Sequence, residues 1–132
     1  MLNKSSSLYP ALEKLASIVV DSIYTVHVEM GPGLLESGYE KCVAYELELR
    51  GLKVMRQVVV PVTYKDHHFD DGMRIDLLVE NQIIIEVKSV KEIEPVHAAQ
   101  ILTYLKLSRL KIGFLVNFNK LLIKDGIKRY VM

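Results

Sequence analysis

The stretch MRIDLLVENQIIIEVKS, Met73 to Ser89, consists of two short apolar runs separated by a polar segment. This pattern predicts an antiparallel β-hairpin. Asp76 interrupts the first run, and Glu86 and Lys88 interrupt the second. Such charges either belong to the solvent-facing side of an ordinary hairpin or converge in a functional site. The geometry of the turn discriminates between these two interpretations.

The length of the hairpin loop decides whether Asp76 and Glu86 share a face. Directly opposed residues of an antiparallel pair point the same way, with their Cβ atoms roughly 5 Å apart. A three-residue loop, 80–82, places Asp76 opposite Glu86, whereas a two-residue loop, 80–81, places Asp76 opposite Ile85. Convergence therefore requires an odd-length loop or a bulge, and Asn81 tolerates the left-handed conformation that such loops use.

Converging charges of these types would suit a divalent cation. Two neighbouring carboxylates repel each other, and a cation removes that cost. Mg²⁺ binds a few carboxylates together with waters and phosphate oxygens, and it can polarise a phosphate and lower the pKa of a bound water. The Lys88 ammonium could orient that water or stabilise the charge that develops on phosphorus. An Asp separated by nine residues from a Glu-x-Lys is common by chance, however, so the flanking sequence has to support the site.

The remaining chain predicts a mixed α/β fold. Apolar periodicity and turn signals favour helices over 12–28, 34–50 and 95–108, strands over 54–64 and 112–118, a polar loop over 65–72, and a final hairpin of 121–123 with 127–131. Pro61 places the strand 54–64 at a sheet edge or makes it irregular. This order indicates a mixed central sheet flanked by helices, with a short C-terminal β tail. The helix 95–108 would return the chain to a parallel strand.

Composition bounds the class of protein. The 132 residues are 50% hydrophobic and 25% charged, which is typical of one globular domain, here 1–132, with a polar segment 1–7 expected to be disordered. The N-terminus lacks a secretory pattern, and the apolar runs are too short to span a membrane. Cys42 is the single cysteine, which excludes an internal disulfide and favours a cytoplasmic location.

Positive charge is concentrated in the C-terminal quarter of the chain. The net charge is +1, so the chain is not a generally basic nucleic-acid binder. Residues 101–132 nevertheless contain a single acid, Asp125, and the following basic residues: Lys106, Arg109, Lys111, Lys120, Lys124, Lys128 and Arg129. This excess either serves a polyanion or consists of ordinary solvated lysines.

Two further segments connect the hairpin to a known family. GLLESGY, Gly33 to Tyr39, has Glu36 three residues after a glycine and Tyr39 three residues later. In HAAQILTYLKL, the residues His97, Gln100 and Tyr104 fall on one helical face. The chain resembles the GxxExxY proteins, a branch of the PD-(D/E)xK nuclease-like superfamily. Besides the hairpin, the segments that carry this resemblance include VHVEMGPGLLESGYEKC, YELELRGL, GFLVNFN and DGIKR. The resemblance extends from about residue 18 to residue 129.

The resemblance implies a restriction-endonuclease-like αβββαβ core and roles for individual residues. Asp76 and Glu86 match the two metal-binding carboxylates, and Lys88 matches the catalytic lysine. Glu36 matches a helical glutamate that often adds to the metal site, and Gln100 matches a polar residue that supports the site or reaches the substrate. Two positions depart from the pattern, since Val87 stands where the family often has Leu and Ile75 where the superfamily has Pro. The carbonyl of Val87 would complete the metal shell.

The expected function is hydrolysis of phosphodiester bonds in nucleic acid, with DNA as the substrate and Mg²⁺ or Mn²⁺ as the cofactor. Further candidates for substrate contact are His97, Tyr104, His27, Lys106 and Arg109. For His27 a structural role is the alternative, and packing is the alternative for Tyr104. A non-catalytic nucleic-acid-binding or assembly module, acting as a homodimer or in a larger complex, is the rival interpretation. Hydrolysis of another phosphodiester also stays open, because a fold does not fix its substrate.

Overall fold

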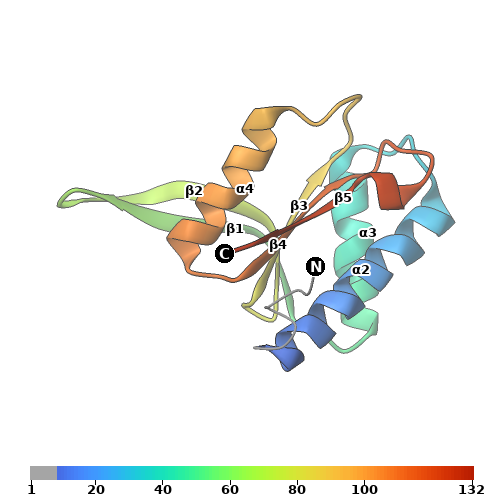
Figure 1. The fold of residues 1–132 in the computed structure, drawn as a ribbon, viewed down its shortest axis with the longest axis horizontal. Coiled ribbons are helices and arrows are strands. Elements are labelled where there is room, and N and C mark those ends of the chain that lie inside the picture. Colours follow the sequence, from blue (N-terminus) through green and yellow to red (C-terminus); the bar gives the residue numbers. More distant parts are fainter. Residues whose placement is uncertain (1–8) are drawn as a thin grey trace.

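The computed structural model describes residues 9–132, so the expected disorder of 1–7 lies outside the described residues. The elements in chain order are α2 (Pro10–Met30), α3 (Glu36–Leu49), β1 (Val54–Tyr64), β2 (His67–Val79), β3 (Ile83–Lys88), α4 (Pro95–Ser108), β4 (Ile112–Asn117), the 3-10 helix η1 (Ile123–Asp125) and β5 (Ile127–Val131). The strands form one sheet in the order β1-β2-β3-β4-β5, in which only β3 and β4 run parallel (Figure 1). The predicted mixed α/β fold with a short C-terminal strand is confirmed.

Helices cover both faces of the central strands. One apolar cluster joins α2 and α3 to Ile83, Ile85 and Val87, and a second joins α4 to Ile84. The β3 strand is therefore buried on both sides, and even Glu86 is only 4% exposed. An ordinary hairpin with a solvent-facing side is excluded by this burial. Within residues 9–132, no helix has both the length and the apolar character required to cross a membrane.

The hairpin between β2 and β3 has the three-residue loop that convergence requires. Val79 pairs with Ile83 and Leu77 pairs with Ile85, so residues 80–82 form the loop. Glu80 and Asn81 adopt φ values of 52° and 54°, which are the left-handed conformations that such a loop uses. The next opposed positions after the Leu77–Ile85 pair are those of Asp76 and Glu86.

The ribbon of β1 and β2 is longer than the sequence predicts. The expected loop over 65–72 is wrong, because β2 begins at His67 and only Lys65 and Asp66 form the turn. Cross-strand pairing with β1 continues to the Tyr64–His67 pair, and this ladder overrides the polar composition. As predicted from Pro61, β1 is an edge strand, and its register shifts between Val60 and Val62. The ribbon projects away from the helices (Figure 1).

The expected C-terminal hairpin of 121–123 with 127–131 is also wrong. The β5 strand pairs with the free edge of β4 over five residues, whereas Ile123 begins the 3-10 helix. A five-residue ladder on an existing sheet satisfies more backbone groups than a three-residue hairpin strand can. Gly126 makes the approach possible, because a Cβ there would lie 2.1 Å from the carbonyl oxygen of Asn117.

Candidate active site

The β2 and β3 strands diverge at Asp76 and Glu86, and these two side chains bridge the fork. Paired backbone contact ends at Leu77 and Ile85. Beyond it, the Asp76 N–H donates to Glu86 Oε2 at 2.9 Å, and the Val87 N–H donates to Asp76 Oδ2 at 2.8 Å. Each carboxylate thus accepts from the backbone of the opposite strand, which holds the two acids beside each other.

The electrostatics at the fork disfavour two ionised carboxylates. Burial raises the pKa of Glu86 to about 8, and the neighbouring Asp76 charge adds to that rise. Burial also raises the pKa of Asp76, while its hydrogen bond from the Val87 N–H acts in the opposite direction. Lys88 lowers both pKa values but does not offset the burial. A divalent cation would provide the missing positive charge.

The donor set fits a hard cation such as Mg²⁺. Asp76 and Glu86 offer carboxylate oxygens, the ligand type that Mg²⁺ prefers, and Mg²⁺ commonly takes only one or two carboxylates and keeps several waters. In the part of the chain from residue 9 onward, no three His, Cys, Asp or Glu side chains are already grouped to hold an ion. Waters, a main-chain carbonyl and substrate oxygens would therefore complete the coordination at the fork.

On the α3 side of the fork lies a cavity of about 360 Å³. Its lining includes Asp76, Val87 and Glu36. Glu36 is the exposed first residue of α3, and its Oε2 accepts the Ser89 N–H at 3.1 Å. The helical glutamate singled out by sequence therefore lies at the same cavity as Asp76, attached to the chain just after β3.

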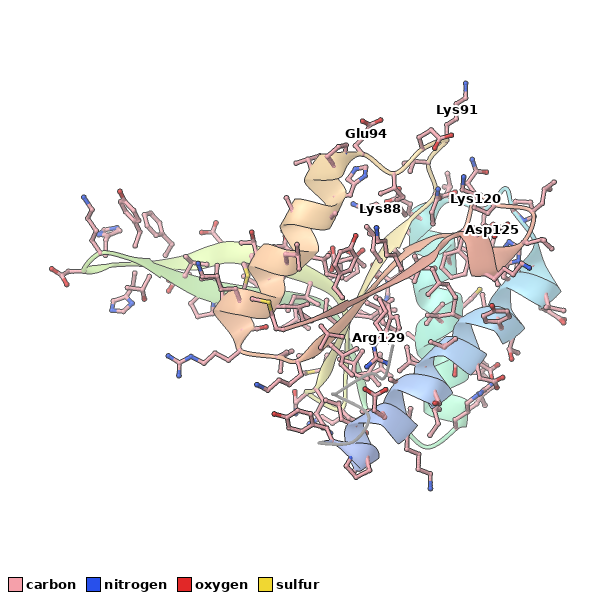
Figure 2. The ribbon with its side chains drawn as sticks, in the orientation of Figure 1. Lys88, Lys91, Glu94, Lys120, Asp125 and Arg129 are labelled. Carbon is pink, nitrogen blue, oxygen red and sulfur yellow. The ribbon has the colours of Figure 1, made fainter. Side chains whose placement is uncertain are left out.

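On the α4 side, Lys88 lines a second cavity of about 500 Å³ with His97, Gln100 and Tyr104. The Gln100 amide donates to the Tyr104 hydroxyl at 3.1 Å. His97 Nδ1 accepts the Glu94 N–H at 3.0 Å, which caps the start of α4. The three predicted α4 residues thus share one cavity with the lysine, which lies at the carboxyl end of β3 (Figure 2).

Other predicted residues lie apart from both cavities. His27 is buried on α2, and its Nε2 lies 2.7 Å from the Lys120 carbonyl oxygen. Lys106 and Arg109 lie at the C-terminal end of α4 and line neither cavity. Arg129, one of the C-terminal basic residues, forms an ion pair with Glu13 of α2. These placements leave Asp76, Glu86 and Lys88, with Glu36 and the α4 residues, as the candidate site.

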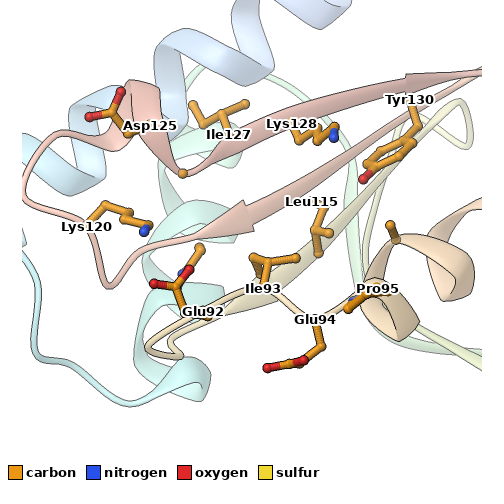
Figure 3. Close-up of a pocket in the computed structure, with 13 residues that line it drawn as sticks. Glu92, Ile93, Glu94, Pro95, Leu115, Lys120, Asp125, Ile127, Lys128 and Tyr130 are labelled. Carbon is orange, nitrogen blue, oxygen red and sulfur yellow. The ribbon is translucent and has the colours of Figure 1, made fainter.

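A third cavity, of about 430 Å³, lies between the segment before α4 and the β4–β5 edge (Figure 3). Acidic and basic side chains both line it, among them Glu92, Glu94, Lys120 and Lys128. None of the fork residues lines this cavity. It is therefore separate from the candidate active site.

Sequence reasoning missed a hydrogen-bonded network beside Asp76, in which Glu40 is buried while Arg56 and Gln57 are exposed. Glu40 is only 5% exposed, and its Oε2 accepts a hydrogen bond from Arg56 Nε at 3.0 Å and forms an ion pair with Arg56 Nη2 at 2.9 Å. Its Oε1 accepts from the Gln57 amide at 2.6 Å. Glu40 was detectable, since it follows Glu36 by four residues and so shares its helical face. Gln57 gives no sequence signal, because it is one polar residue in an edge strand.

Asn117 is a second missed residue, and it ties the end of β4 to the segment after Lys88. It is fully buried. Its Oδ1 accepts hydrogen bonds from the N–H groups of Val90 and Asn119 at 3.1 and 3.2 Å, and its Nδ2 donates to the Val90 carbonyl at 2.9 Å.

Asn117→Ala should lower the free energy of unfolding by about 2–4 kcal/mol, because buried backbone groups lose their partners. Urea denaturation measures this. The exposed Asn119→Ala is the control and should cost less than about 1 kcal/mol; equal effects would contradict this role.

Of the comparisons with known proteins, the one with family models gives a match. A family model described as the PD-(D/E)XK nuclease superfamily matches residues 13–130. No curated protein and no solved structure matches the chain. The match extends from α2 into β5 and includes the fork and both of its cavities. The chain therefore belongs to the PD-(D/E)XK nuclease superfamily.

Proposed function

We propose that this chain, as a single domain over 1–132, is a metal-dependent nuclease that hydrolyses phosphodiester bonds in DNA. One observation carries the proposal: Asp76 and Glu86 lie together at the fork, and burial raises the pKa of Glu86 to about 8. Such a pair costs folding energy unless it has a ligand. Within the superfamily, the spacing of Gly33, Glu36 and Tyr39 supports placement in the GxxExxY branch.

The proposed roles follow the positions of the side chains. Asp76 and Glu86 bind Mg²⁺ or Mn²⁺, and the Val87 carbonyl and Glu36, directly or through water, complete the site. The bound ion supplies polarisation of the phosphate and a lower pKa for a coordinated water. Lys88 follows Glu86 by two residues and lines the α4 cavity, so its ammonium positions the attacking water or stabilises charge on the phosphate.

The proposed substrate contacts lie along α4. Gln100, His97 and Tyr104 line the cavity that contains Lys88, which places polar groups where a phosphodiester would approach. Lys106 and Arg109, further along the helix, would contact the nucleic-acid backbone and make binding sensitive to salt. His27 is assigned a packing role, because its ring bonds the Lys120 carbonyl and lies beside Phe118.

A cleavage panel tests the proposal. The protein is incubated with supercoiled, linear, single-stranded and branched DNA and with RNA, in Mg²⁺, Mn²⁺ or EDTA. We expect cutting of DNA only with a divalent cation. Asp76→Asn should reduce the rate by more than about a hundredfold, because even residues that merely support metal ligands cost 10–100-fold when changed. The Asn side chain can still accept the Val87 N–H, so the fold should persist.

Two outcomes would contradict the assignment. Cutting in EDTA would exclude a metal mechanism, and cutting that persists at the wild-type rate in Asp76→Asn would exclude this site. If wild type cuts nothing, Mn²⁺ titration by calorimetry decides what the fork does. A wild-type affinity equal to that of the double variant Asp76→Asn, Glu86→Gln would favour the rival interpretation, a binding or assembly module without catalysis.

A further inference from the structure

Gln57 adopts a backbone conformation that its place in the fold does not require. Five non-glycine residues of the described chain have positive φ. Lys65, Glu80 and Asn81 lie in turns, and Arg109 ends α4. Gln57, with φ 52°, lies inside the β1 strand. Residues with a side chain rarely adopt this region, and such outliers concentrate at functional sites.

The register places Gln57 opposite Asp76. The flanking pairs are Arg56 with Leu77 and Val58 with Ile75, so Gln57 and Asp76 face each other between them. Leu77 packs in the cluster of α2 and α3, whereas Ile75 packs in the cluster of α4. Residues two apart in a regular strand share a face. The side chains of the β1–β2 ribbon therefore change from one face of the sheet to the other at this position. In β1, the irregular backbone conformation at this position is that of Gln57.

The turned backbone directs the Gln57 amide between two carboxylates. Its Nε2 donates to Glu40 Oε1 at 2.6 Å and to Asp76 Oδ1 at 3.3 Å. A primary amide has two N–H donors, and an ionised carboxylate only accepts, so both donors are used. Glu40 is in turn held by Arg56. The chain Arg56–Glu40–Gln57 thus extends from α3 and β1 to one oxygen of Asp76.

Asp76 is consequently held at both oxygens. Oδ1 accepts from Gln57, and Oδ2 accepts from the Val87 N–H. Each oxygen keeps a further lone pair for a ligand. Hydrogen bonds of this kind fix the plane of a metal-binding carboxylate before the ion arrives. Without the amide, Oδ1 would lose its fixed donor, and the carboxylate could rotate about the bond to Val87.

We propose that Gln57 is a positioning residue, which orients the Asp76 carboxylate for a divalent cation through its contact with Glu40. This inference rests on the proposed function. It explains why β1 retains a left-handed glutamine where a glycine would be less strained. The amide is needed at this position, and the backbone conformation is what brings it there.

Two substitutions separate the amide from the backbone. Gln57→Ala removes the amide and keeps the unfavourable φ, whereas Gln57→Gly removes the amide and relieves it. We expect both to weaken Mn²⁺ binding, measured by calorimetry, by roughly tenfold or more and to similar extents. The Tm of the glycine variant should exceed that of the alanine variant by a few degrees. The matched control is Lys65→Gly, which relieves the same φ in the distant β1–β2 turn and should leave Mn²⁺ affinity unchanged.

A merely structural role predicts a different pattern, in which affinity follows stability. Full recovery of Mn²⁺ affinity in Gln57→Gly would therefore overturn the inference, as would wild-type affinity in both variants. A positioning role also predicts that cleavage by both variants returns to within a few-fold of wild type at saturating Mn²⁺. The variants would then differ from wild type mainly in requiring a higher Mn²⁺ concentration. If wild type itself binds no Mn²⁺, the proposed function fails, and this inference fails with it.

Discussion

Lys88→Ala is expected to reduce DNA cleavage by about a hundred- to a thousandfold while leaving the fold intact. The Lys88 ammonium acts electrostatically on both Asp76 and Glu86 and also lines the α4 cavity. In the proposed function, it is therefore the positive side chain that an approaching phosphodiester would meet beside the carboxylates. Its removal would take away a donor aimed at the reacting atoms, which is the type of interaction with the largest effect on a chemical step.

The matched control for this variant is Lys91→Ala. Lys91 is exposed in the segment after β3 and points outward, away from Lys88 (Figure 2). It should retain cleavage within a few-fold of wild type. Mn²⁺ binding should persist in Lys88→Ala but shift to higher pH, because Asp76 and Glu86 both remain while the loss of the lysine raises the pKa of each. Cleavage by Lys88→Ala at the wild-type rate would refute the assignment of the lysine.

In the metal-free protein, the free energy of unfolding is expected to fall as the pH rises from about 5 to about 8. The Glu86 pKa is about 8 in the folded protein and near its usual 4.5 in the unfolded chain. The folded state therefore binds this proton more tightly, and the stabilisation is complete below the unfolded pKa and lost as the pH rises through the folded value. Glu86 alone should contribute roughly 4 kcal/mol to this decrease, and Asp76, whose pKa burial also raises, should add to it.

Below about pH 4.5 the trend should reverse. Arg129 lowers the pKa of Glu13 through a hydrogen bond, so this pair contributes stability that is lost when Glu13 is protonated. Urea denaturation in EDTA, from below pH 4.5 to about pH 8, measures both the loss of stability at low pH and the loss of stability at high pH. Added Mg²⁺ or Mn²⁺ should reduce the fall in the free energy of unfolding between about pH 5 and pH 8, because a cation binds the ionised carboxylates of the folded state.

Glu86→Gln is the control that isolates the buried acid. The Gln side chain has the same shape, can accept the Asp76 N–H and cannot ionise. The variant should be more stable than metal-free wild type at pH 8, lose most of the pH dependence, and lose cation binding and cleavage. A rise in stability together with a loss of function distinguishes a ligand-binding acid from a structural one. An unchanged pH dependence would show that another group is responsible.

The sequence predicted most of the elements that position the site. The bounds of α4 were predicted as observed, because Pro95 marks a helix start and the apolar spacing continues to Ser108. The sequence left the hairpin loop open between 80–81 and 80–82, and the structure has the three-residue loop, with Asn81 at positive φ. The missing N–H of Pro61 predicted an edge or irregular β1, and β1 is both. The two wrong predictions concern segments whose structure depends on pairing with another strand. Residues 67–72 pair with β1 across a two-residue turn, despite their polar composition, and residues 127–131 pair with β4 instead of with 121–123.

By itself, the sequence determined the hairpin, the alternation that separates Glu86 and Lys88 from the apolar residues of β3, and the spacing of Asp76 and Glu86. These features depend on contacts between residues close in the chain, and strand periodicity is sufficient to predict them. Only the tertiary structure decided that β3 is buried on both faces, which is the cause of the raised pKa of Glu86. It alone brought Glu40 and Gln57 to Asp76 and Asn117 to Val90, because hydrogen bonds across packed elements depend on where the backbone folds and leave no periodic pattern in the sequence.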